Sequence, residues 1–175
     1  AHIAAQYGHL DVLQFLDEKD CSLVKKGRAD WTILHYATRF GHLHVVQWID
    51  SAFFSPSVPS TDVTSLTPIG PSTQKQQKMS QLSFGNTTEA GANALHLAAQ
   101  SGNIALLQYL LSEECFMNRG SQGRGTAPLM MKKCDSKGAT LSHYAVSSGS
   151  LPLLDWMFAE GYLQPNAVDT AHRTP

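Results

Sequence analysis

The sequence is poor in charged residues, in cysteine and in long apolar runs. Lys and Arg number 13 and Asp and Glu number 14, so the formal net charge of −1 excludes a chain-wide basic surface for nucleic acid. Three cysteines, with no Cys-x-x-Cys pair among them, are too few for a disulfide framework or a zinc ribbon. Every apolar run is far shorter than the roughly 18 residues of a membrane span.

The size and apolar content of the chain are those of a globular protein. Its 175 residues allow one domain or one array of small units, and 42% of them are hydrophobic, enough to form a core. The low cysteine content indicates a reducing, intracellular compartment, which we expect to be the cytoplasm, with the nucleus as an alternative. Because a repeating pattern reaches both ends, we also expect the chain to be a fragment of a longer protein.

One pattern recurs four times along the sequence. Each copy has a histidine, an alanine two residues later, a glycine six residues later, and apolar or aromatic residues eight to fourteen residues later. The defining pairs of histidine and glycine are His2 and Gly8, His35 and Gly41, His96 and Gly102, and His143 and Gly149. The first spacing is 33 residues, and the later spacings of 61 and 47 equal 33 plus insertions of 28 and 14. Such a period indicates a repeat architecture.

Each copy predicts a short helix, a tight turn and a second helix. The apolar residues on both sides of the glycine have helical spacing, and the glycine supplies a positive φ where the first helix ends. Neither helix can bury its apolar face alone, so we expect the units to stack and bury one continuous core. An aromatic residue recurs at one position of the second helix, where we expect it to be buried between units. The four aromatic residues are Phe15, Trp48, Tyr109 and Trp156.

The copies resemble the ankyrin repeat, whose signature runs Thr-Pro-Leu-His-x-Ala-Ala-x-x-Gly-His. Residues 32–42 read TILHYATRFGH, and residues 93–103 read NALHLAAQSGN. The resemblance implies an all-α solenoid of stacked helix–turn–helix units with short hairpin loops. Three departures loosen the turn geometry: Pro is missing from every Thr-Pro step except the last, Ser142 replaces the usual Leu, and Asp30 stands where Gly is expected.

The predicted organisation has two pairs of repeats separated by an insertion. Residues 1–54 hold a truncated first repeat and the second, residues 89–168 hold the third and fourth, and residues 169–175 begin a fifth. Ser, Thr, Pro, Gln, Asn and Gly fill 24 of the 34 positions of residues 55–88, which predicts one long disordered insertion. A second, basic insertion lies within residues 115–137.

Both insertions leave alternatives open. Ser55 and Thr67 each precede a proline and are candidate sites of proline-directed phosphorylation, and an unmodified linker is the alternative. Residues 115–137 carry five Lys or Arg and one Asp, a local charge of +4. This loop either meets an acidic partner or is a solvated loop without a role. Binding of nucleic acid through Lys132 and Lys133 would predict a steep salt dependence, and the near-neutral total charge disfavours it.

The sequence predicts no catalytic residue, cofactor or metal site, and hence no enzyme. The resemblance implies that the signature histidines are structural and hydrogen-bond the backbone of neighbouring units. Zinc binding would require these histidines to converge, whereas stacked copies hold them about 10 Å apart. No cysteine has a recognisable histidine and acid beside it in the sequence, which disfavours a catalytic thiol.

The resemblance also implies which positions contact a partner. Residues four and five after the signature histidine lie on the concave face, and residues four, six and seven before it lie on the tip of the hairpin. The candidate binding residues that follow are Gln6, Tyr7, Arg28, Trp31, Arg39, Phe40 and Gln100. Since aromatic residues and Arg dominate interface energetics, we expect the partner to contact Tyr7, Trp31, Arg39 and Phe40. Packing of Trp31 and Phe40 between neighbouring units is the alternative.

The expected function is therefore binding of another protein, as a scaffold or adaptor, with no small-molecule substrate. The alternative is a regulatory or targeting segment of a larger enzyme or channel, because ankyrin repeats are often joined to such domains. A direct catalyst using histidine or cysteine is a further alternative that the motifs disfavour.

Overall fold

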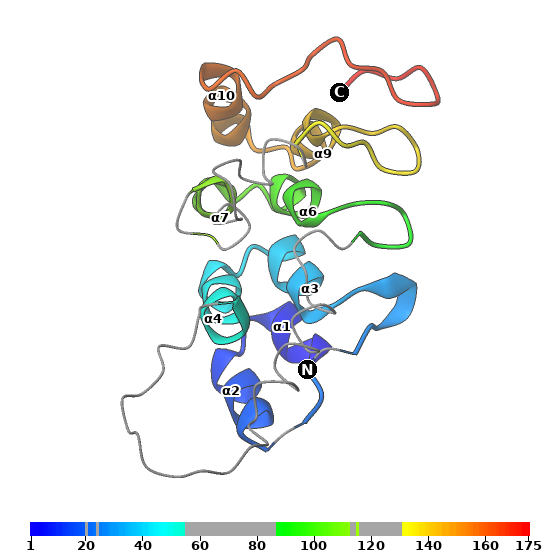
Figure 1. Ribbon diagram of the computed structural model, residues 1–175. Coiled ribbons are helices and arrows are strands. Elements are labelled where there is room, and N and C mark those ends of the chain that lie inside the picture. The colour runs from blue at the N-terminus through cyan, green and yellow to red at the C-terminus, as the bar shows by residue number, and fades with distance from the viewer. Residues whose placement is uncertain (20, 24, 55–86, 113–114, 116–130) are drawn as a thin grey trace, which may run out of the picture.

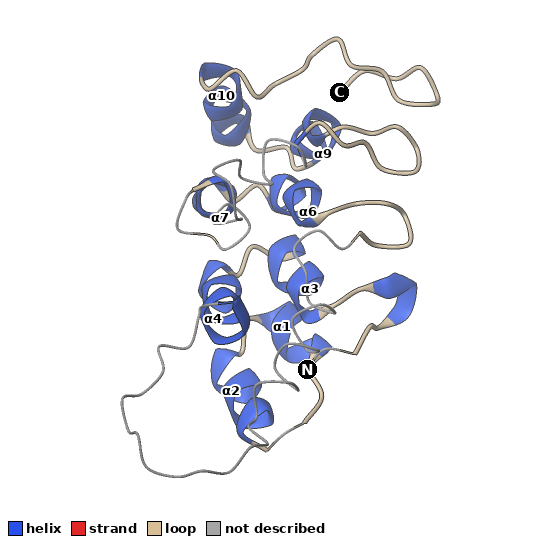
Figure 2. Cartoon of the chain, viewed as in Figure 1, coloured by secondary structure: helices blue, strands red, loops and turns tan. Residues whose placement is uncertain are grey.

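The computed structural model describes residues 1–19, 21–23, 25–54, 87–112, 115 and 131–175. These residues form helices and loops and contain no strand (Figure 2). The helices are α1 (His2–Tyr7), α2 (Leu10–Glu18), α3 (Ile33–Arg39), α4 (Leu43–Phe54), α6 (Ala94–Ser101), α7 (Ile104–Leu111), α9 (Leu141–Ser147) and α10 (Leu151–Ala159), with a 3-10 turn η1 (Arg28–Asp30).

The helices form a stack of four antiparallel pairs. Helices α1, α3, α6 and α9 make one layer, and α2, α4, α7 and α10 make the other (Figure 1). Between the pairs the chain projects beyond the first layer in loops, here called fingers, at residues 25–32, 87–93, 132–140 and 164–174. The prediction of an all-α solenoid of helix–turn–helix units is confirmed.

Small and branched apolar residues explain the close stacking. The alanine two residues after each signature histidine is buried in all four pairs, so the first helices pack against one another with little between them. The second helices bury larger side chains against them, including Val45, Leu106 and Leu153. Each such fully buried side chain contributes about 1.5–3 kcal/mol relative to an exposed one. The resulting core runs without interruption from the first pair to the fourth.

The turn within the first pair needs a glycine for two reasons. Gly8 has φ 72°, in the left-handed region that glycine adopts cheaply. A Cβ atom at this position would also come within 2.7 Å of Nδ1 of His42, whose ring belongs to the next unit. The His42 ring is held there because its Nε2 hydrogen-bonds the carbonyl oxygen of Gln6 at 2.7 Å. The absence of a side chain at Gly8 therefore also leaves room for the His42 ring that joins the two units.

The expectation that all four recurring aromatic residues are buried between units is wrong for Phe15. Its side chain is 55% exposed, with Nζ of Lys19 5.6 Å above the ring. The equivalent Trp48 is covered by Phe53, with ring centroids 5.9 Å apart. Trp156 is likewise covered by Tyr162, at 5.7 Å. The difference lies in the covering side chain, which is the aromatic ring of Phe53 within α4 or of Tyr162 beyond α10, and is the charged Lys19 at the end of α2.

Several predictions concern residues outside the described ranges. The insertion at 55–88 begins directly after α4, and only its last two residues are described. Ser55, Thr67 and residues 116–130 of the basic insertion also lie outside the described part of the chain. The disordered insertion and the phosphorylation sites therefore remain predictions.

Candidate functional site

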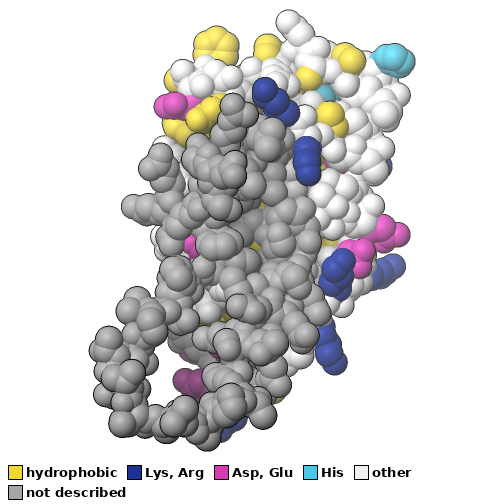
Figure 3. All heavy atoms as spheres, viewed as in Figure 1, with side chains coloured by type: hydrophobic (Ala, Val, Ile, Leu, Met, Phe, Trp, Pro, Cys, Tyr) yellow, Lys and Arg dark blue, Asp and Glu magenta, His cyan; other side chains and the backbone are white. Residues whose placement is uncertain are grey.

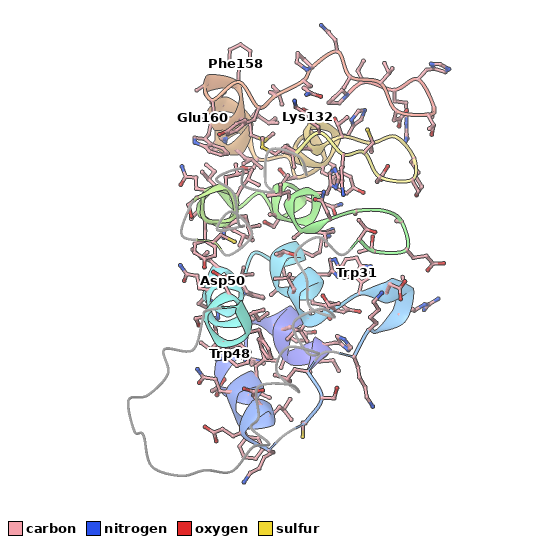
Figure 4. The ribbon with its side chains drawn as sticks, in the orientation of Figure 1. Trp31, Trp48, Asp50, Lys132, Phe158 and Glu160 are labelled. Carbon is pink, nitrogen blue, oxygen red and sulfur yellow. The ribbon has the colours of Figure 1, made fainter. Side chains whose placement is uncertain are left out.

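A hollow of about 360 Å³ opens where the η1 finger, residues 25–32, leans over α1 and α3. Trp31 lies between this finger and α3 (Figure 4). The residues that line this cavity, called the finger hollow, are Gln6, Arg28, Ala29, Trp31, Tyr36, Arg39 and Phe40. It draws its lining from two helices and one loop, so a ligand there would contact two successive units at once.

The shape of the η1 finger follows from an unusual local sequence. In the later fingers, the residue eight positions before the signature histidine has a side-chain oxygen that accepts backbone N–H groups. In the finger of residues 132–140 this residue is Asp135, which accepts the N–H groups of Lys137 and Ala139 at 2.8 Å. The η1 finger has Gly27 there, against the ring of His2, and has no side chain to make these bonds. The Gly27 N–H donates to the Trp31 carbonyl at 2.6 Å, a backbone bond that the later fingers also make at the equivalent positions. This bond closes the loop around η1 and sets the position of Trp31.

Aromatic rings form one wall of the finger hollow. The rings of Trp31 and Tyr36 lie 5.0 Å apart at 56°, a tilted arrangement that aromatic pairs favour. Tyr36 also contacts the ring of His2, at 5.5 Å, so it is fixed between the first two units. Phe40, at the end of α3, is 49% exposed. An apolar side chain of a ligand would find a prearranged aromatic surface here.

Two arginines give the finger hollow a positive charge. No Asp or Glu is among the described residues that line it. Within the described part of the chain, the side chains of Arg28 and Arg39 enter no ion pair. Asp30, next to them in the finger, faces Lys26 instead, with Nζ and Oδ1 3.7 Å apart. Several Lys and Arg side chains lie along the finger side of the stack, with Asp and Glu side chains among them (Figure 3). The two guanidinium groups are thus available to an anionic group.

The structure brings five of the seven predicted binding residues together in this hollow: Gln6, Arg28, Trp31, Arg39 and Phe40. Tyr7 is not in the lining. Its ring is 63% exposed and stacks on His9, with centroids 6.2 Å apart. Sequence reasoning missed Ala29 and Tyr36. The signal for Tyr36 was available, because it directly follows a signature histidine, as Tyr144 does.

Gln100 lies at a second, smaller hollow of about 160 Å³. Its lining residues are Gln100, Ala139, His143, Tyr144 and Ser147, and we call it the second hollow. Tyr144 donates a hydrogen bond to Oδ2 of Asp135 at 2.8 Å. Burial raises the pKa of Tyr144, and the bond to Asp135 raises it further, so the phenol stays protonated at neutral pH. The second hollow contains no Arg, Lys, Asp or Glu.

The two hollows are built from equivalent positions of different repeats. Relative to the signature histidine, Gln6 matches Gln100 and Tyr36 matches Tyr144. Two other positions differ in kind: Trp31 is matched by Ala139, and Arg39 by Ser147. The finger hollow is therefore the aromatic and cationic counterpart of the second hollow.

The signature histidines join one unit to the next and do not converge. In His96, Nδ1 accepts the backbone N–H of Asn93 at 3.1 Å, so Nε2 carries the proton and donates to the Lys133 carbonyl at 3.0 Å. His143 repeats this geometry with Thr140 and the Arg173 carbonyl. Burial lowers the pKa of His96, outweighing the opposite effects of its bond to Lys133 and the charge of Asp135. These contacts agree with the structural role that the resemblance implies.

The last finger is fixed by an acidic residue. Asp169 accepts hydrogen bonds from the backbone N–H of Ala171 and of Arg173, each at 2.9 Å, and pairs with the Arg173 guanidinium at 2.7 Å. The backbone and side-chain hydrogen bonds from Arg173 lower the pKa of Asp169 to about 2. The carboxylate is therefore charged throughout the physiological range and is used within the finger.

The described residues contain no cluster of three or more His, Cys, Asp or Glu side chains arranged to hold a metal ion. Within the same residues, no helix is both long enough and apolar enough to cross a membrane.

Comparison with known proteins gives two matches. The sequence profile of a family described as ankyrin repeats (many copies) matches residues 1–49. A second profile, described as ankyrin repeats (3 copies), matches residues 75–169, more than half of the chain. No individual curated protein matches significantly.

Proposed function

The chain belongs to the ankyrin-repeat family, whose repeats are generally protein–protein interaction modules, and we propose that it binds a partner protein through the finger side of the stack. The two matches also confirm the resemblance deduced from the repeated motif. The bound surface would comprise the finger hollow and the concave face beside it, and the chain would act as a scaffold or adaptor.

The observation that carries this proposal is the composition and position of the finger hollow. Trp31, Arg39 and Phe40 are of the residue types that most often dominate interface energetics. Phe40 is half-exposed although the core beside it is well filled, so packing alone does not explain this residue. A rigid aromatic surface costs little conformational entropy when a partner binds, which favours affinity.

We propose that the chain itself catalyses no reaction. The histidines are used in contacts between units, and Cys21 and Cys134 are exposed thiols that lie far from each other in sequence. Exposed thiols suit a reducing compartment, which supports the cytoplasm as the proposed location, with the nucleus as the alternative. The alternative function is that this stack regulates or targets an enzyme or channel elsewhere in a longer chain.

The test compares capture of partners by the wild-type chain and by the double variant Arg39→Ala/Phe40→Ala. We expect the double variant to lose captured proteins while its melting temperature stays within a few degrees of wild type. Phe158→Ala is the matched control, because Phe158 is 72% exposed on α10 and points away from the finger hollow (Figure 4). Unchanged capture by the double variant would contradict the proposal, and a large loss of stability would favour a packing role for Phe40.

A further inference from the structure

We propose that the finger hollow binds an extended acidic segment of the partner protein, with an Asp or Glu carboxylate at Arg28 and Arg39 and a neighbouring apolar side chain against Trp31 and Phe40. This inference rests on the proposed protein-binding function and adds the chemistry of the ligand.

Charge complementarity indicates the carboxylate. The lining of the finger hollow has two guanidinium groups and no acid, and neither group enters an ion pair in the described part of the chain. The whole chain carries a net charge of only −1, so this positive site is a local feature. A guanidinium group offers a planar fork of N–H donors that matches a carboxylate, and such charge-assisted bonds are stronger than neutral ones.

The aromatic wall indicates an apolar neighbour for that carboxylate. The Trp31 ring packs on Tyr36 and lies against His35, and the Trp31 backbone is held by the Gly27 N–H. Phe40 leaves half of its side chain open beside it. An isolated anion would leave these rings in contact with water, whereas a peptide with an apolar side chain next to its carboxylate covers both.

The relation between the two hollows indicates an extended segment. The finger hollow lies between α1 and α3, and the second hollow lies between α6 and α9, in the same layer of helices (Figure 1). Two steps of about 8–10 Å between packed helices separate them, which an extended chain spans in about six residues. The second hollow is neutral and smaller, so it suits a short uncharged side chain.

The probe is a displayed library of random 12-residue peptides, selected against the immobilised wild-type chain. We expect the enriched peptides to carry Asp or Glu next to an aromatic or aliphatic residue. For a synthetic copy of an enriched peptide, changing that acid to its amide should weaken binding by about tenfold or more, measured by fluorescence anisotropy. The dissociation constant should also rise as salt is added, because the contact is between charges.

The chain supplies its own conservative variants. Arg39→Ser and Trp31→Ala place in the finger hollow the residues that the second hollow has at the same positions, Ser147 and Ala139. We expect about tenfold weaker peptide binding for each variant, with a melting temperature near wild type for Arg39→Ser and a lower one for Trp31→Ala, which loses the ring contact with Tyr36. Lys26→Ala removes a positive charge from the same finger outside the lining and should change binding less than about threefold.

The outcomes separate this inference from the proposed function. Enriched peptides without an acid, or with equal affinity for wild type and Arg39→Ser, would overturn the inference while protein binding stands. Binding that requires phosphoserine in place of the acid would overturn the assignment of a carboxylate. If no peptide is enriched, the proposal of an extended segment is wrong. Capture of partners by the Arg39→Ala/Phe40→Ala chain tests the proposed function independently of that result.

Discussion

The η1 finger holds two consecutive residues in the left-handed region of backbone conformation, Ala29 with φ 58° and Asp30 with φ 61°. The sequence pointed to Asp30, because glycine is expected at that position and is present in the two later fingers as Gly91 and Gly138. The sequence did not indicate a positive φ at Ala29, whose equivalents in the other fingers have ordinary backbone angles. Residues other than glycine lose about 1–2 kcal/mol in this region.

Replacing Ala29 by glycine is therefore expected to stabilise the chain. The relief of strain outweighs the extra freedom that glycine gives the unfolded chain, so the net gain should be about 0.5–1 kcal/mol. Thermal or urea denaturation measures it. Ala90 has the equivalent position in the next finger without a positive φ, so Ala90→Gly should destabilise by about 0.5–1 kcal/mol. A loss of stability in Ala29→Gly would show that its backbone conformation is not strained.

Ser142 departs from the repeat signature, and the structure gives the reason. Its side chain is buried in α9, where the equivalent residues of α3 and α6 are the buried Leu34 and Leu95. The Ser142 hydroxyl oxygen accepts the backbone N–H of Gln164 at 2.8 Å. The departure thus replaces an apolar contact by a hydrogen bond that fixes the chain after α10.

Ser142→Ala should lower the free energy of unfolding by about 1 kcal/mol, because it removes this hydrogen bond and leaves a small void. Ser147→Ala is the control in the same helix. The Ser147 hydroxyl is exposed and bonds only the Tyr144 carbonyl one turn earlier, so its loss should have little effect. Equal stabilities for the two variants in urea denaturation would mean that the Gln164 bond contributes nothing.

At the scale of the element, signature histidines have two roles, capping their own helix and binding the following finger, and His96 and His143 have both. In α3, α6 and α9 the histidine closes a capping box with Thr32, Asn93 or Thr140. The capping bonds require the neutral ring, because Nδ1 must accept the backbone N–H of the cap residue, whereas Nε2–H can donate to the finger carbonyl in either protonation state. Protonation of Nδ1 would place a hydrogen against the N–H of the cap residue, so acid should disrupt the capping bond at the start of the helix.

The chain should accordingly lose stability as the pH falls below the ordinary histidine value of about 6.5. The pKa of buried His96 is lowered on folding, so its contribution is complete above the unfolded pKa and is lost as the pH decreases towards the folded pKa. Histidine NMR spectra should show His96 neutral below pH 6.5. In His96→Gln, the dependence of the melting temperature on pH between 7 and 5 should be weaker. An unchanged dependence in that variant would contradict the assignment.

The order and pairing of the helices could be predicted from the sequence, because they follow from the repeat of 33 residues. The glycine and the alanine of each copy mark a turn and a close contact, so the helix pairs and their stacking follow from the sequence. The exposure of Phe15 could not be predicted from the same period, because it depends on whether a second aromatic ring covers it, and that ring has no fixed position in the repeat. Tyr36 was missed because the signature treats its position as variable, although its ring fills the space beside Trp31.

At the scale of the whole molecule, the second and third units stack directly although 61 residues separate their signature histidines. Nδ2 of Asn103 donates to the Gly41 carbonyl at 3.0 Å, and the Glu89 N–H donates to the Ala29 carbonyl at 3.0 Å. The core continues from α3 and α4 into α6 and α7. Residues on both sides of the insertion thus contact each other directly.

Replacing residues 55–86 by an eight-residue Gly/Ser linker tests the predicted disorder of the insertion. A uniform repeat of 33 residues would leave only four residues between the same points, so eight are long enough. Shortening an unstructured connection fourfold should stabilise the stack by about 1.2 kcal/mol, since each halving of a loop recovers about 0.6 kcal/mol of closure entropy. Urea denaturation of the shortened and full chains measures the difference. A loss of stability would mean that the insertion packs on the stack, and the prediction that it is disordered would then be wrong.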